Sequence, residues 1–194
     1  GVSIEGMAGS HNLRLSVSRG GFSQVNYRQN QRLVDIACDM AELSGGERLL
    51  DIFCGNGNFS IPLATRCREV VGIEEYPPSV DDAIYNAVSN CIGNVSFICA
   101  DAESGVARLA ADGDLFDVVL LDPPRSGAAR VMEQIPALRP QRVVYISCDP
   151  VTLARDVAIL KKLDYSVVRS APVDMFPQTS HLESVTLLER KKYN

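Results

Sequence analysis

From Glu47 onward, short apolar runs alternate with segments whose apolar residues recur at helical spacing. Runs of about four to eight aliphatic and β-branched residues are typical of buried strands, whereas a 3.6-residue period is typical of helices that pack on a sheet. Alternation of this kind predicts a parallel sheet with helices on both faces. We therefore expect an α/β fold with a Rossmann-like sheet.

The expected strands are residues 48–53, 70–73, 95–99, 116–121, the run that begins at Val143, 166–172 and 183–189. We expect the last two to pair as an antiparallel hairpin, so that the seven-stranded sheet is mostly parallel. Helices are expected over residues 58–67, 79–90, 102–111, 128–138 and 150–163. An earlier helix carries Leu33, Ile36, Ala37, Met40 and Ala41 and is expected to end at Gly45-Gly46. In the helix over 79–90, Val80, Ile84, Ala87 and Val88 are expected to form one apolar face.

Ligands of parallel sheets bind at the carboxyl ends of the strands, so functional residues are expected just after each strand. Cys148 ends the apolar run that begins at Val143, and Asp149 and Pro150 then supply a helix N-cap and first turn. A helix N-terminus favours negative charge, which suits a thiolate nucleophile at Cys148. The alternative for Cys148 is a small buried hydrophobic residue.

A Gly-rich turn over residues 51–60, Asp-Ile-Phe-Cys-Gly-Asn-Gly-Asn-Phe-Ser, joins the first strand of the alternating region to a helix. A dinucleotide fingerprint needs a third glycine where Ser60 stands, so the turn fits a nucleoside without phosphates, such as S-adenosylmethionine (SAM). Glu74, after the second strand, is placed to bind ribose hydroxyls, and Asp101, after the third, to meet an adenine amino group. The alternative is an ordinary tight turn flanked by solvated acids.

The loop Asp122-Pro123-Pro124-Arg125-Ser126-Gly127 follows the fourth strand. Its two prolines fix the backbone and hold Asp122 at the strand end. Enzymes that methylate exocyclic amines carry an aromatic residue where Arg125 stands; an arginine instead binds phosphate or pairs with a carboxylate. The alternative is a rigid turn in which Arg125 makes a surface salt bridge.

The loop over residues 174–183 joins the last two expected strands and brings acidic residues and a histidine to the edge that carries Cys148. Both His181 and Glu183 are candidates for a general base. A structural histidine and a solvated strand-edge acid are the alternatives, and the spacing does not choose among them.

Residues 1–23 are rich in Gly and Ser and contain a period-two stretch over residues 13–18. We expect a short lead-in β segment without a core of its own, the remnant of a preceding domain, followed by a catalytic domain over residues 24–194.

The net charge of −5 is the reverse of the basic surplus that nucleic-acid binders usually carry. The six cysteines form no CxxC pair, so neither a zinc site nor an iron–sulfur site is predicted and no metal ligand is assigned. The sequence shows neither a membrane span nor the pattern of a signal peptide, and we expect a cytoplasmic protein with reduced thiols.

Five motifs occur in a characteristic order: FSQVN, DIFCGNGNFS, DPPRSG, SCDPVTLARD and DMFPQTSHLE. Together they resemble the SAM-dependent RNA 5-methyluridine methyltransferases, the family of tRNA and 23S rRNA uracil methyltransferases. The resemblance implies a class I SAM-dependent methyltransferase fold, with Cys148 as nucleophile, Glu183 as base and a uridine held in a loop or flipped out of its stack. It also implies a set of SAM-binding residues: Gln24, Phe53, Asn58, Glu74, Asp101 and Asp122.

The chain departs from this family at Asp149, where Asn is more frequent, and in lacking the usual upstream OB-type RNA-binding domain, which often holds an iron–sulfur cluster. The choice between tRNA and rRNA stays open. Methylation of another RNA position, a SAM- or RNA-binding module without chemistry and, less favoured by Ser60, a nicotinamide dehydrogenase are the alternative functions.

Overall fold

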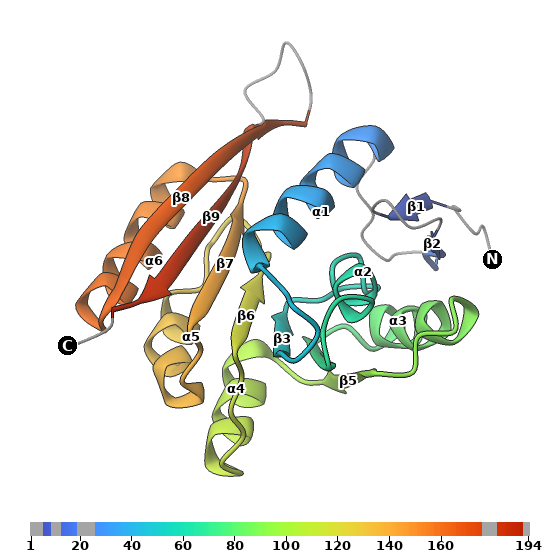
Figure 1. The fold of residues 1–194 in the computed structure, drawn as a ribbon, viewed down its shortest axis with the longest axis horizontal. Helices are drawn as coiled ribbons and strands as arrows, with labels where there is room; N and C mark the ends of the chain where they lie inside the picture. Colours follow the sequence, from blue (N-terminus) through green and yellow to red (C-terminus); the bar gives the residue numbers. More distant parts are fainter. Residues whose placement is uncertain (1–5, 9–12, 19–25, 176–181, 192–194) are drawn as a thin grey trace.

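The apolar runs of the sequence form one twisted sheet in the computed structural model, which describes residues 6–8, 13–18, 26–175 and 182–191 (Figure 1). The strand order is β5-β4-β3-β6-β7-β9-β8. These strands are β3 (Arg48–Ile52), β4 (Glu69–Glu74), β5 (Val95–Cys99), β6 (Val118–Leu121), β7 (Arg142–Ser147), β8 (Tyr165–Asp174) and β9 (Leu182–Arg190). Strands β3 to β7 pair in parallel, whereas β9 is antiparallel to β7 and β8. The predicted mostly parallel sheet with a terminal hairpin is confirmed.

The expected helices are present. The helix over 102–111 has the predicted bounds, and the bounds of the others differ. They are α1 (Tyr27–Ala41), α2 (Ser60–Ala64), α3 (Pro77–Ser89), α4 (Ala102–Ala111), α5 (Ala129–Gln134), a 3₁₀-helix (Ile135–Leu138) and α6 (Pro150–Lys162). Helix α1 ends before Gly45-Gly46 because Glu42 already adopts a left-handed conformation, at φ 48°. The segment 128–138 is split, since Pro136 has no N–H with which to continue α5.

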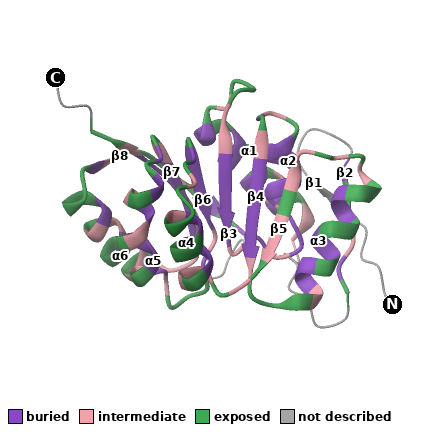
Figure 2. Cartoon of the chain, turned by 90° about the horizontal axis from the view of Figure 1, so that it is seen from below, coloured by how far each residue is buried: buried purple, intermediate pink, exposed green. Residues whose placement is uncertain are grey.

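Helices cover both faces of the sheet, and the alternation of side chains along each strand divides the core in two. Leu49 of β3 packs in a cluster with residues of α1 and α2. Leu50 and Ile52, which point to the opposite face, pack with residues of α4, α5 and α6. Figure 2 shows the central strands buried, whereas the edge strand β5 is largely intermediate or exposed.

The predicted apolar face of α3 is wrong in part. Val80 and Ala87 are buried, but Ile84 is 48% exposed and Val88 is 72% exposed. The buried face of α3 includes polar residues in place of Ile84 and Val88, because Asn86 and its neighbours along the helix bind the backbone of residues 14–18. Apolar periodicity alone could not reveal this partner.

The described part of the N-terminal segment contains strands β1 (Gly6–Ala8) and β2 (Leu13–Leu15), which pair antiparallel as expected of a lead-in β segment. Leu13 and Leu15 are buried against Ile61 of α2. The segment therefore packs on α2 in a small apolar cluster apart from the two main ones, and the boundary between residues 23 and 24 stays a prediction.

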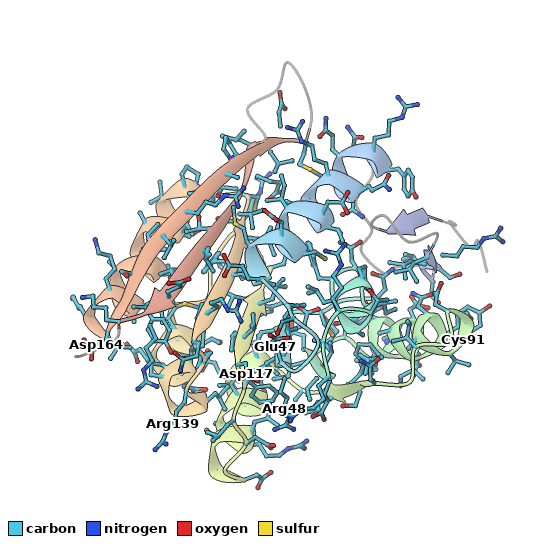
Figure 3. The ribbon with its side chains drawn as sticks, viewed as in Figure 1. Glu47, Arg48, Cys91, Asp117, Arg139 and Asp164 are labelled. Carbon is cyan, nitrogen blue, oxygen red and sulfur yellow. The ribbon has the colours of Figure 1, made fainter. Side chains whose placement is uncertain are left out.

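The amino ends of the central strands are tied by charged side chains, of which Figure 3 labels Arg48 and Asp117. The Arg48 guanidinium contacts Glu69 at 2.8 Å and Asp114 at 2.6 Å, and its backbone N–H donates to Asp117. This edge lies opposite the carboxyl ends of the strands, and these contacts hold the amino ends of neighbouring strands together. No helix in the described ranges is long and apolar enough to cross a bilayer.

Candidate active site

The residues predicted to carry function converge on one edge of the sheet. Phe53, Asp101, Asp122 and Cys148 each follow a parallel strand, and Glu74 ends one. Because carboxyl ends of parallel strands meet at one edge, these residues lie along one rim of the sheet. Two further candidates, Gln24 and His181, fall outside the described residues.

Strand register brings Cys148 and Glu183 together. The antiparallel pairing of β7 with β9 places Ser147 opposite Ser184, and the Ser184 hydroxyl donates to the Ser147 carbonyl at 3.3 Å. Cys148 directly follows the last paired residue of β7, and Glu183 directly precedes Ser184 in β9. The two side chains are near enough for the charge of Glu183 to raise the pKa of the Cys148 thiol. The sheet thus juxtaposes a thiol and a carboxylate that are 35 positions apart in the sequence.

Cys148 is half-buried, and its thiol is less acidic than its place beside a helix suggested. Burial and the charges of Glu183 and Asp122 raise the pKa of Cys148, whereas Arg125 lowers it. The sequence-based expectation that the N-terminus of α6 favours the thiolate is therefore wrong in its net direction. Asp149 caps α6 by accepting from the N–H groups of Val151 and Thr152, and these hydrogen bonds lower its own pKa.

Three carboxylates share the interior of the site. Burial, with the neighbouring charges of Glu183 and Asp51, raises the pKa of Asp122 to about 8. Burial raises the pKa of Asp51 to about 7, against the hydrogen bond that it accepts from the Ser60 hydroxyl at 2.5 Å. Burial also raises the pKa of Glu183. Asp122 and Asp51 are thus held near their protonation equilibrium at neutral pH, where proton transfer is most effective.

Two of the predicted SAM-binding side chains hold the Gly-rich turn itself. The Glu74 carboxylate accepts from the Gly55 N–H at 3.0 Å and from the Tyr76 N–H at 2.8 Å. The Asn58 amide makes reciprocal hydrogen bonds with the amide of Asn30 in α1, at 2.8 and 3.0 Å. A carboxylate has about four acceptor sites, so Glu74 can accept further hydrogen bonds from a ligand. The sequence did not predict that Asn30 is the hydrogen-bond partner of Asn58.

The turn needs a left-handed backbone at three positions. Phe53, Gly55 and Gly57 have φ values of 67°, 54° and 87°. Only Phe53 among them carries a side chain, and it faces a cleft of about 330 Å³. Strain at a non-glycine residue is frequently found at binding sites.

This cleft joins the Gly-rich turn to the DPPRSG loop. Its wall includes Phe53, Asp101, Pro124 and Gly127. Asp101 also caps α4 by accepting from the Ser104 N–H at 2.9 Å, and hydrogen bonds from Ser104 lower its pKa. The volume is in the range of small-ligand sites. Phe53 and Asp101 thus line the same cleft.

A buried network that sequence reasoning missed fastens the DPPRSG loop to α6. Asp156 is fully buried and accepts from the Ala128 N–H at 2.6 Å and from the Tyr145 hydroxyl at 2.7 Å. Arg155 bridges Asp156 at 2.8 Å and donates to the Ser126 carbonyl at 2.8 Å. The only signal in the sequence was the presence of Tyr145 in an apolar strand and of Asp156 in the helix that follows this strand.

Asp51 is a second residue whose role the sequence left unassigned. Its Oδ1 atom is buried and has no hydrogen-bond partner within the described part of the chain. A buried acceptor without a donor is costly, so the position fits a ligand that brings one. Within the same residues, no cluster of three or more His, Cys, Asp or Glu side chains is arranged to hold a metal ion.

Comparison with known sequences identifies close relatives. Residues 7–191 match the family of tRNA (uracil-5-)-methyltransferases. The 23S rRNA (uracil(1939)-C(5))-methyltransferase RlmD of Cronobacter sakazakii is 49% identical over 181 residues, which are 93% of this chain and 42% of that protein. The protein of the same name from Aeromonas hydrophila is also 49% identical, over 92% of this chain and 41% of its own length. The chain thus spans less than half the length of these curated relatives.

Solved structures place the fold in the same group. The tRNA (uracil-54, C5)-methyltransferase of Pyrococcus abyssi, in complex with S-adenosyl-L-homocysteine, superposes with a TM-score of 0.79 at 31% identity, over 92% of this chain and 42% of that one. Magnesium protoporphyrin IX methyltransferase from Synechocystis, with bound SAM, shares the fold at a TM-score of 0.69 and 21% identity, over 88% of this chain and 87% of that one. With a family match over nearly its whole length and relatives at close to half identity, the chain belongs to the tRNA (uracil-5-)-methyltransferase family.

Proposed function

We propose that this chain is the catalytic domain of an RNA uridine methyltransferase that transfers a methyl group from SAM to carbon 5 of uracil through a covalent adduct with Cys148. The observation that carries the proposal is the pairing of β7 with β9, which ends at Ser147 and Ser184 and leaves Cys148 near enough to Glu183 to feel its charge. A nucleophile and a base side by side at the carboxyl edge of the sheet are the two groups that this reaction needs.

The residues present fit SAM. The cleft beside the Gly-rich turn has the volume for part of a nucleoside and offers Phe53 and Asp101 to its base. We assign Glu74 to its sugar and Asp122 to neighbouring polar groups, and we include Asn58 and Gln24 in the proposed set. The unpaired Oδ1 atom of buried Asp51 is an acceptor for an ammonium group of the kind that the amino-acid part of SAM carries.

The chemistry begins at Cys148, because carbon 5 of uracil is a weak nucleophile by itself. The thiolate adds to carbon 6, and the electron pair of the 5,6 double bond moves to the enolate formed by carbon 5, carbon 4 and its oxygen. SAM, when bound, supplies the electrophilic methyl group that carbon 5 takes up. Glu183 then accepts the proton of carbon 5, the double bond re-forms, and the thiolate leaves carbon 6. The raised pKa of Glu183 suits this acceptance of a proton.

A uridine reaches this position only when it is unstacked, so the substrate base is expected in a loop or flipped out of a helix. The curated relatives at 49% identity act, by name, on 23S rRNA, whereas the Pyrococcus protein at 31% acts on tRNA. We therefore propose ribosomal RNA as the first substrate class to test.

The test uses an RNA hairpin that carries 5-fluorouridine, together with SAM. Fluorine at carbon 5 cannot leave as a proton, so the adduct is trapped and is visible on a denaturing gel and by peptide mapping. The expected result is an RNA adduct on Cys148 that Cys148→Ala abolishes and that Cys91→Ala, a change at an exposed cysteine, retains. Methylation at full rate by Cys148→Ala would overturn the covalent mechanism. A methylated nucleoside other than 5-methyluridine would overturn the target position.

A further inference from the structure

Helix α3 binds the N-terminal segment as the edge of a sheet would. Three side chains, two from α3 and one from its C-cap residue, are spaced about one turn apart and accept hydrogen bonds from the backbone N–H groups of alternate residues in an extended segment. The pairs are Asn90 with Arg14 at 2.9 Å, Asn86 with Ser16 at 2.8 Å and Asp82 with Ser18 at 2.7 Å. Four helical residues rise about 6.0 Å and two strand residues about 6.6 Å, so the two repeats match over this length.

The middle one of these three residues, Asn86, also contacts the Gly-rich turn. The Asn86 amide nitrogen donates to the Ser16 carbonyl at 3.0 Å and to the Asn56 carbonyl at 3.0 Å. The Asn56 side chain in turn donates to the Ser16 carbonyl at 3.3 Å. Asn86 is fully buried and has every donor and acceptor but one lone pair in use. Of the three residues, Asn86 is the one that hydrogen-bonds both to the N-terminal segment and to the turn.

The turn rests on α3 at a second point. A side-chain carbon at Gly57 would lie 2.8 Å from Ile61 and 3.7 Å from Ala83, which is one turn before Asn86 along α3. The carbonyl of Asn56 therefore has little freedom to move unless Asn86 moves as well. By contrast, the amide of Asn90 donates to the carbonyls of Arg14 and Asn86, neither of which belongs to the turn.

We propose that Asn86 is a positioning residue for the cofactor turn and that residues 13–18 hold it in place, so that the docking of this segment and the binding of SAM are coupled. The inference rests on the proposed use of SAM. Residues 13–18 would then support the binding site from outside, since none of them lines the cleft that contains Phe53. Coupling of two binding events is reciprocal, so each tightens the other.

The test compares Asn86→Asp with Asn90→Asp. In both variants an acid with at most one O–H replaces an amide that donates to two carbonyls, so each loses at least one hydrogen bond with little change in shape. SAM binding is measured by calorimetry, and methyl transfer is measured against SAM concentration. The thermal midpoint of each variant identifies a temperature at which all are folded.

We expect Asn86→Asp to raise the dissociation constant of SAM about tenfold, and Asn90→Asp to leave it within about twofold of the unaltered chain. Stoichiometry should stay at one, and the rate at saturating SAM should be retained. Loss of a folded fraction would instead lower the stoichiometry. Equal dissociation constants in the two variants would overturn the assignment of Asn86 as the positioning residue.

A second measurement needs no variant. Amide hydrogen exchange of the unaltered chain should slow at Ser16 when SAM binds, and unchanged exchange at Ser16 would overturn the coupling. If the unaltered chain binds no SAM, both the proposed function and this inference are wrong. If it binds SAM and the two variants behave alike, the inference alone is wrong.

Discussion

Cys148 lies between charges of opposite sign, and its reactivity depends on their balance. Arg125 lowers the pKa of its thiol, whereas burial, Glu183 and Asp122 raise it. A thiol that is mostly protonated reacts slowly with oxidants and alkylating agents. Approach of a positive charge to the carboxylates would shift the balance toward the thiolate.

Opposite changes are therefore expected from the two neighbours. Arg125→Ala should raise the pKa of Cys148 further and slow its alkylation by iodoacetamide at pH 8, and Glu183→Gln should lower that pKa and speed alkylation. Mass mapping follows Cys148 over time, with exposed Cys91 as an internal control whose rate should not change. Equal rates in both variants would show that neither charge acts on the thiol.

Asp122 predicts a pH dependence of stability. Its pKa is raised from 3.8 to about 8 in the folded protein, chiefly by burial. Between these values the folded chain holds a proton that the unfolded chain has lost, so its contribution to stability falls as pH rises from about 4 to 8. Asp122→Asn mimics the protonated form at every pH.

The variant should therefore gain stability over the unaltered chain as pH rises, with little difference at pH 4. Urea unfolding at intervals of pH measures this, with Asp39→Asn, a change at an exposed ion pair, as the control. A constant difference across the range would contradict the raised pKa.

At the scale of elements, α6 is fastened both to the sheet and to the DPPRSG loop by one buried acid. Asp156 accepts from Tyr145 in β7 and from Ala128 after the loop. A side-chain carbon at Gly127 would lie 2.6 Å from Asp156 Oδ2, so the loop follows the surface of α6 closely. The placement of Arg125 near Cys148 depends on this attachment.

Removing the acid should be costly. Asp156→Ala leaves a hydroxyl, an N–H and an arginine without their buried acceptor and should lower the free energy of unfolding by about 3–5 kcal/mol. Tyr145→Phe removes one hydrogen bond and should cost about 1 kcal/mol. Denaturant titration measures both values. Similar losses in the two variants would mean that Asp156 acts through Tyr145 alone.

At the scale of the whole molecule, charge and length both bear on RNA. The chain carries a net charge of −5 and spans 42% of its Cronobacter relative. Affinity for nucleic acids derives largely from contacts of Lys and Arg with phosphates, which an acidic chain supplies sparingly. Delivery of the uridine is therefore expected to need basic residues beyond those in this chain.

We expect this chain to bind SAM with an affinity near that of the full-length relative but to methylate a 23S rRNA fragment at least about tenfold more slowly at equal RNA concentration. Calorimetry and a filter assay with labelled methyl groups measure the two quantities. Equal rates of methylation would show that the catalytic domain recognises RNA by itself.

The sequence predicted the fold well because its signals are local. Apolar runs and helical periods are set by residues a few positions apart, and they located the seven strands of the sheet. Helix ends were less accurate, as Glu42 and Pro136 show, since they depend on single backbone conformations. Strand ends also gave the positions of Phe53, Asp101 and Cys148 on one edge.

By itself the sequence determined the order of strands and helices, the edge that carries the site and the candidate residues on it. Tertiary structure alone decided which of them lie close together: Cys148 near Glu183, beyond the last pair of β7 and β9, and Asn86 against the cofactor turn. It also decided the raised pKa of Cys148. The physical reason is range, because hydropathy and propensity act along the chain, whereas register, burial and electrostatic fields depend on segments that only folding brings together.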